Sequence, residues 1–260
     1  MDLVGGIAMK YNLRLALMST FVVFLLGLAF VSSASAAPVG PTVILPQGSS
    51  RYGTPGAANI SAIAGNVTEI NFNVSFSSTT WQGYYGNITG TIVLGNSANQ
   101  SLYDWNVATP RGQIYATRTS LVPTWTAIRC ANRTEINAED TALGVNQSFD
   151  QDSVNRTFLN TTEFGAFYVG ATLINSTAVN GTGFPIDCFA TQLNDQNGDP
   201  TSAFSEVILS DTNNTVYTGI ISMPTTGFDG RSHQFQMLVG ENGQNGDSTS
   251  TPYYFYLELS

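Results

Sequence analysis

The chain has 260 residues, and only 10% of them are charged, against about 25% in ordinary globular domains. Eighteen acidic residues oppose nine basic ones, so the formal net charge is −9 at pH 7. Because nucleic acids and anionic lipid surfaces both require a positive patch, this balance argues against either as a partner.

The first 36 residues have the pattern of a secretory signal peptide. Lys10 and Arg14 precede a mostly apolar run from Leu15 to Val31, and Ala34-Ser35-Ala36 has the small-x-small pattern of a cleavage site. We expect cleavage after Ala36, which leaves an extracellular or cell-surface protein without a membrane anchor. An uncleaved anchor is the alternative, because the apolar run of 17 residues approaches the length of a short span.

The mature chain contains no lysine, and its seven arginines oppose seventeen acidic residues. Asn, Thr, Ser, Gln and Gly replace charged residues, which predicts a neutral, hydrogen-bonding surface. The length suffices for one large β domain or two small ones.

Acceptor sequons for N-glycosylation (N-x-[ST]) are in excess. The chain contains twelve, whereas its asparagines would give roughly five by chance. An excess spread over the whole domain predicts a glycan coat, with a polar β-rich surface as the alternative explanation. The acceptors are Asn59, Asn66, Asn73, Asn87, Asn99, Asn132, Asn146, Asn155, Asn160, Asn175, Asn180 and Asn213.

Two cysteines, Cys130 and Cys188, remain in the mature chain, and neither belongs to a CxxC or metal-spaced cluster. In an oxidising exterior this pair predicts a disulfide. A bridge over about 58 residues would stabilise the fold by roughly 4 kcal/mol in the chain-entropy model.

Residues 37–56 are rich in proline and glycine around the short apolar patch Val43-Ile44-Leu45, and this composition predicts an extended arm. The following residues, 57–260, are expected to form the folded domain. Its first predicted strand is Glu69–Phe76, where apolar and polar residues alternate. Further strands are predicted at 86–94, 101–109 and 124–130, with a hairpin over 102–118 that turns at Thr109-Pro110-Arg111-Gly112.

Between the cysteines, a short helix is predicted at Glu135–Leu143, with Thr134 as its cap and Gly144 at its end. A second helical turn is predicted within 152–159. Because six sequons also fall in this interval, we interpret residues 131–187 as a small helical, sugar-bearing insertion.

After Cys188 the strand signals return, at 204–209, 216–222, 235–239 and 253–259, with a turn at Asp211-Thr212-Asn213-Asn214. Short strands with regular turn signals favour a mainly β fold, an antiparallel β-sandwich for which a Greek-key topology is one option.

Catalytic patterns are scarce. His233 is the only histidine, no GxSxG elbow occurs, and zinc would need clustered ligands that the chain lacks. A carboxylate-pair glycosidase remains compatible with the sequence, but the scattered acids do not indicate a pair. We therefore expect no enzyme activity and no cofactor apart from the calcium hypothesis below.

One acidic turn has partial metal-site spacing. Asp195, Asn197 and Asp199 are spaced like the start of a calcium loop. Glu206 falls at the twelfth position, but Pro200 replaces the expected glycine and no helices flank the loop. The alternative is a polar Asx-type turn.

The abundant aromatic residues have two possible roles. Exposed rings on a β fold could bind sugar by stacking, whereas β propensity also places such rings in cores and on sheet faces. The residues concerned are Trp81, Tyr84, Tyr85, Tyr103, Trp105, Trp125, Tyr253, Tyr254 and Tyr256.

In overall style, with an AxA signal and a sequon-dense, lysine-free β domain, the chain resembles secreted cell-surface proteins of archaea; no motif identifies a named family. The leading hypothesis is a glycosylated filament or surface-layer subunit that pairs with like subunits, or with other cell-surface proteins, by adding Val43-Ile44-Leu45 to a neighbouring sheet edge. Pairing of this arm within its own domain is the alternative. An adhesin or carbohydrate-binding module is the second hypothesis, and an extracellular hydrolase is the third.

Overall fold

The computed structural model describes residues 37–53, 55–120, 124–176, 188–242 and 250–259, all within one of the two units into which the chain divides, Ala36–Ser260. The predicted signal peptide, its cleavage site and the sequon Asn180 lie outside the described residues. The described chain is mainly β and its sheets are antiparallel, as the sequence predicted.

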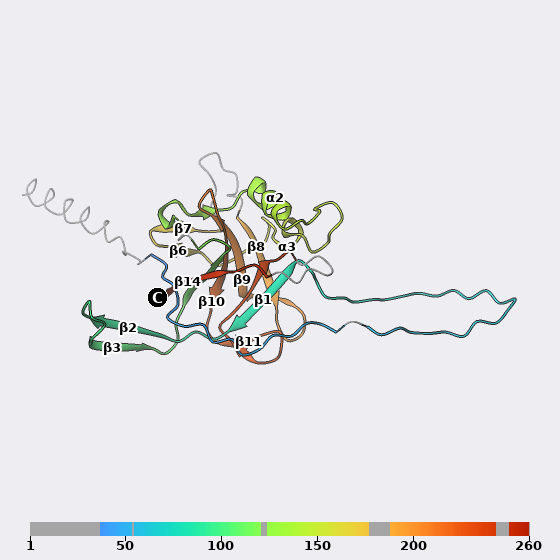
Figure 1. Cartoon of the computed structure of the whole chain (residues 1–260), viewed down its shortest axis with the longest axis horizontal. Coiled ribbons are helices and arrows are strands. Elements are labelled where there is room, and N and C mark those ends of the chain that lie inside the picture. The colour runs from blue at the N-terminus through green and yellow to red at the C-terminus, as the bar shows by residue number, and fades with distance from the viewer. Residues whose placement is uncertain (1–36, 54, 121–123, 177–187, 243–249, 260) are drawn as a thin grey trace, which may run out of the picture. The chain divides into compact units, whose positions relative to one another are not determined.

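A six-stranded antiparallel sheet forms the centre of the fold, and Figure 1 shows its long strand β9 beside β10 and β8. The sheet has the order β14-β4-β10-β9-β5, and β8 also pairs with β9. Their bounds are Tyr254–Leu259 (β14), Gly112–Thr117 (β4), Thr215–Ile221 (β10), Pro200–Ser210 (β9), Arg129–Cys130 (β5) and Phe189–Asn194 (β8).

An apolar core packs against each face of this sheet. Because successive strand residues point to opposite sides, each central strand contributes to both cores. On β9, Ile208 belongs to one apolar core while its neighbours Val207 and Leu209 belong to the other. Strand β10 divides in the same way between Tyr217 and Val216. The sequence of a central strand that is buried on both faces is therefore a continuous apolar run and does not alternate.

The elements that contribute to the first core are α2 (Arg133–Ala142), α3 (Val154–Thr157) and the paired strands β1 (Trp81–Gly86) and β13 (Phe235–Gly240). Those that contribute to the second are the 3-10 turn η1 (Trp125–Ala127) and the paired strands β6 (Phe167–Val169) and β7 (Thr172–Ile174). The remaining pairs are β2 (Gly90–Gly95) with β3 (Ser101–Val107), and β11 (Thr225–Thr226) with β12 (Ser232–His233).

The predicted helix is present as α2, but Thr134 is not its cap. Asn132 precedes the helix, and its side-chain oxygen accepts a hydrogen bond from the Glu135 backbone N–H, 3.0 Å away. The Glu135 carboxylate accepts in return from the Asn132 N–H at 2.8 Å. This reciprocal capping box satisfies two backbone donors at once and so starts the helix two residues earlier. Gly144 follows the helix with φ +70°, as its predicted end requires.

Three strand predictions are wrong in whole or in part. Of the strand predicted over 124–130, only Arg129–Cys130 (β5) is a strand, because Trp125–Ala127 form the 3-10 turn η1, in which Trp125 packs into the second core. Residues 69–76 are extended but pair with no other strand among the described residues. The hairpin predicted over 102–118 does not form either, because β3 pairs back onto β2 and β4 joins the central sheet between β10 and β14. Strand β4 gains two partners and two buried faces there, which a local hairpin could not provide.

Candidate functional site

The segment that precedes β1, residues 37–53 and 55–80, is a mostly exposed arm, longer than the arm predicted at 37–56. Figure 1 draws it as an extended trace that contains no strand arrow. It is tied to the central sheet at one point, where Val39 and Leu257 exchange backbone hydrogen bonds of 2.9 and 2.7 Å. Beyond that point, the predicted assembly residues Val43, Ile44 and Leu45 are 65%, 57% and 71% exposed. The arm thus presents apolar side chains to solvent four to six residues beyond its bridge to a sheet edge.

That edge belongs to β14, whose other side is paired with β4. Because backbone hydrogen bonds alternate along a strand, Phe255 and Leu259 share the outward direction that Leu257 uses. Continuing the antiparallel register from Val39 would place Pro41 opposite Phe255. Proline has no N–H to donate, so the intramolecular pairing ends after one bridge. The edge is otherwise without a strand partner in the described part of the chain.

The second half of the arm carries the misassigned strand Glu69–Phe76. Its four apolar side chains are exposed, with Phe72 at 88% and Phe76 at 80%. The alternating pattern is that of a strand with one apolar face. Among the described residues this chain supplies no strand partner for it.

The β2–β3 pair is a second exposed apolar feature. Its register sets Ile92 opposite Trp105 and Leu94 opposite Tyr103, so these four side chains share one face. All four are about half exposed or more, and none belongs to either core. The hairpin therefore has an apolar face for which the described chain provides no cover.

The other aromatic residues singled out from the sequence are dispersed. Trp125 and Tyr256 are buried in the second core, and Trp81 packs against Phe158 in the first. Tyr103 and Trp105 are both exposed and in ring contact, with centroids 4.8 Å apart. Tyr85 makes a similar exposed contact with Phe228, at 4.9 Å.

The calcium hypothesis rested on four residues that the fold uses separately. The Asp195 carboxylate accepts from the backbone N–H groups of Asn197, at 2.7 Å, and Asp199, at 3.2 Å, which is the geometry of an Asx turn. Glu206 lies in the core instead and accepts from the Leu238 N–H at 2.8 Å. Within the described ranges, no group of three or more His, Cys, Asp or Glu residues is placed to hold a metal ion.

His233 is buried and its Nε2 lies 2.8 Å from Asp229 Oδ1. Burial acts to raise the pKa of the Asp229 carboxyl, but hydrogen bonds from the Arg231 backbone N–H and from His233 lower it to about 2. The other ring nitrogen, Nδ1, has no hydrogen-bond partner among the described residues. The contact with Asp229 therefore ties the His233 ring to the carboxylate of the turn four residues before it.

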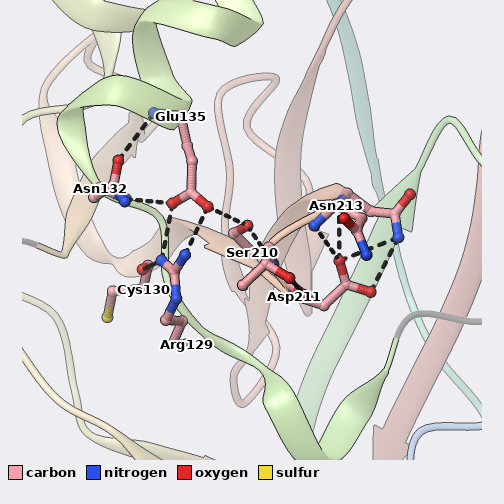
Figure 2. Close-up of polar contacts among 9 residues, drawn as sticks. Arg129, Cys130, Asn132, Glu135, Ser210, Asp211 and Asn213 are labelled. Atoms are coloured by element: carbon pink, nitrogen blue, oxygen red, sulfur yellow. Dashed lines mark hydrogen bonds and ion pairs between the residues drawn. The ribbon is translucent and has the colours of Figure 1, made fainter.

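The predicted disulfide between Cys130 and Cys188 is confirmed, with the two Cα atoms 4.9 Å apart. Figure 2 shows the polar network that begins next to it. Arg129 makes a bidentate pair with Glu135, whose carboxylate also accepts from Ser210 at 2.8 Å. Burial acts to raise the pKa of Glu135, and the hydrogen bonds from Arg129, Asn132 and Ser210 lower it overall. The network holds α2 against the end of β9.

Two sequon asparagines differ in the hydrogen bonds that their side-chain amide nitrogen makes. In Asn132 the capping box uses the side-chain oxygen, which leaves the amide nitrogen, the atom that carries an N-glycan, outside that contact. In Asn155 the amide nitrogen donates to Asn137, at 2.9 Å, and to Gln147, at 3.2 Å. The exposed acceptors are Asn59, Asn66, Asn73, Asn87, Asn99, Asn132, Asn146, Asn160 and Asn213, whereas Asn155 and Asn175 are half-buried.

The arm, the β14 edge and the β2–β3 hairpin thus share apolar side chains, few charges and an extended backbone. None of the helices in the described part of the chain has the length and apolar character needed to cross a membrane. No known protein family, curated protein or solved structure matches this chain.

Proposed function

We propose that this chain is a glycosylated structural subunit of the cell exterior, which assembles with like subunits or other cell-surface proteins by strand addition. The observation that carries the proposal is the exposed apolar patch Val43-Ile44-Leu45, on an arm that is bridged at Val39 to a sheet edge. Exposed edges are templates for pairing with another chain, since their N–H and C=O groups lack partners. Main-chain hydrogen bonds would supply affinity and the apolar side chains specificity.

The proposal also covers how the antiparallel sheets are arranged in the fold. We infer a β-sandwich of Greek-key type in which β1 and β13 belong to the second layer, with residues 131–187 as an insertion. Support comes from the contribution of Met237 and Val239 on β13 to the core on one face of the central sheet. Export and glycosylation rest on the signal pattern and the sequons.

The test is deletion of residues 37–48 from the purified mature protein, followed by light scattering and negative-stain microscopy. We expect the intact protein to form filaments or lattices and the truncated protein to remain monomeric. A matched pair of triple variants separates the apolar patch from the loss of chain length. Val43→Asn, Ile44→Asn and Leu45→Asn should abolish assembly, whereas Gln47→Ser, Ser49→Ala and Ser50→Ala should not. Unchanged assembly after the deletion would show that the arm is not the donor.

A carbohydrate-binding module is the second candidate, and the exposed Tyr103–Trp105 pair favours it. The ring planes are inclined at 56°, whereas a flat sugar platform needs rings that are close to coplanar. A monomeric protein with reproducible hits on a glycan array would move the assignment to this class.

A further inference from the structure

The β2–β3 hairpin lacks a cover for its apolar face. An isolated two-stranded hairpin is marginally stable in water, and a hydrophobic face normally needs a third strand or another layer. The exposed parts of Ile92, Leu94, Tyr103 and Trp105 together amount to roughly 500 Å², which is within the ~300–600 Å² of the largest patch on a typical monomer. Patches of this size are frequently interaction sites.

The segment Glu69–Phe76 has the complementary property. Ile70, Phe72, Val74 and Phe76 project from one side of the extended chain and expose on the order of 600 Å². The segment contains neither proline nor glycine, in contrast to residues 37–56, so nothing in its sequence interrupts an extended conformation.

We propose that the apolar side of Glu69–Phe76 in one copy covers the apolar face of the β2–β3 hairpin in a second copy. This inference rests on the proposed function and extends its contact to a second part of the same interface. The donor copy adds Val43-Ile44-Leu45 to the β14 edge and covers the hairpin with Glu69–Phe76, and assembly needs both parts. The two acceptor surfaces are neighbours, since a Cβ at Gly90 of β2 would lie 3.0 Å from the Leu259 side chain of β14. The two faces together would bury about 1,000 Å², which is more than most non-specific protein contacts bury.

Charge and polarity agree with this pairing. The segment's one charged residue, Glu69, lies on its polar side with Asn71, Asn73 and Ser75. The hairpin's one charged residue, Asp104, lies opposite Val93, on the face away from Tyr103 and Trp105. No charge is therefore desolvated when the apolar sides meet.

The sequons are also placed compatibly. Asn73 lies on the polar side of the segment, and Asn87 and Asn99 lie outside the two strands of the hairpin. A glycan at Asn73 would point away from the contact, and glycans at the other two sites would attach outside the paired strands, so a sugar coat and this interface can coexist.

Connectivity favours a partner in a second copy over cover within one chain. The segment enters β1 at Trp81 and the hairpin leaves it after Gly86, so the two features attach to opposite ends of a strand about 20 Å long. Donor and acceptor are different surfaces, so the contact is heterologous and repeats head to tail. An interface of that kind produces open filaments unless its rotation closes a ring.

The experiment uses two complementary double variants of the full mature chain. The donor variant carries Phe72→Ser and Phe76→Ser, and the acceptor variant carries Tyr103→Ser and Trp105→Ser. The matched control, Asn71→Ser with Ser75→Thr, alters the polar side of the donor segment and keeps the Asn73 sequon. Because none of the four aromatic residues belongs to either core, all variants should retain the wild-type far-UV circular dichroism.

We expect the wild type and the control to assemble and each double variant alone to be monomeric by light scattering. An equimolar mixture of the two variants should double in mean mass and grow no further. The intact donor of one variant binds the intact acceptor of the other, and the resulting pair has no intact surface left. Failure of the mixture to double, or wild-type assembly by either double variant, would overturn the pairing while leaving the proposed function in place. A wild type that stays monomeric would overturn both.

Discussion

Buried carboxylates in this protein differ in how completely they are partnered. Glu139 accepts from the Tyr217 hydroxyl at 2.7 Å and forms an ion pair with Arg118 at 2.6 Å. Glu206 accepts one hydrogen bond, from the Leu238 N–H, and its other oxygen has no partner within the described residues. Burial raises the pKa of the Glu206 carboxyl well above its ordinary value of 4.5. Desolvation of the charged form is therefore the dominant effect at this residue.

Replacing Glu206 with Gln should stabilise the protein at neutral and higher pH. The folded state holds the Glu206 proton more tightly than the unfolded state, so its contribution to stability is complete below about pH 4.5 and is lost as pH rises through the raised folded pKa. Glutamine keeps an acceptor for Leu238 and cannot ionise. We expect a gain on the order of 1 kcal/mol at pH 8 and a smaller one at pH 4, measured by urea unfolding.

Glu69→Gln is the matched control for that experiment, because it makes the same chemical change on the exposed arm. Its free energy of unfolding should follow the wild-type pH profile. If Glu206→Gln also ran parallel to the wild type from pH 4 to pH 8, the burial of this carboxyl would not govern the pH dependence.

At the scale of elements, α2 depends on its first turn. The capping box of Asn132 and Glu135 supplies partners for two backbone donors, and the Glu135 carboxylate also binds Arg129. The helix has ten residues and would be marginal by itself in water. Its start is therefore coupled to the strand that holds Arg129.

Asn132→Ala should lower the free energy of unfolding by about 1 kcal/mol, since it removes the side-chain acceptor for the Glu135 N–H. Asn132→Asp is the matched control, because aspartate caps as well as asparagine but cannot carry an N-glycan. Chemical denaturation of both variants separates the two effects. Equal losses would indicate that the glycan, rather than the cap, stabilises this region.

The elements differ in how far local sequence could predict them. Strands β9 and β10 and the turn between them were predicted, because Asp211 accepts from the N–H groups of Asn213 and Asn214 within four residues. Local turn chemistry was enough there. The hairpin expected around Pro110 had a similar turn signal, but β4 found partners more than a hundred residues away. Tertiary pairing prevailed over that local signal.

At the scale of the whole molecule, the candidate assembly surfaces are nearly uncharged. The arm contains Arg51 and Glu69, and the hairpin contains Asp104. Charges on the remaining surface are few, and their interactions are screened beyond about 10 Å at 0.1 M salt. Assembly should accordingly depend on apolar burial and backbone pairing.

Raising sodium chloride from about 0.05 to 1 M should leave the mean mass of the assemblies unchanged, because screening acts on charges that the contact does not use. Replacing chloride with sulfate should increase the mean mass, since excluded salts strengthen apolar burial. Light scattering across both series tests this. Dissolution of the assemblies by sodium chloride would point to ion pairs that the described surfaces do not contain.

The sequence by itself determined the mainly β character and the Cys130–Cys188 disulfide, because strand alternation, turn residues and cysteine count are local or compositional properties. Only the tertiary structure decided where strand-like segments find partners. Glu69–Phe76 and β14 carry similar alternating patterns, yet β14 lies against β4 and the other lies in solvent. A period-2 pattern specifies which face seeks burial, but the supply of a neighbouring strand depends on the whole fold and, as we propose, on a second copy.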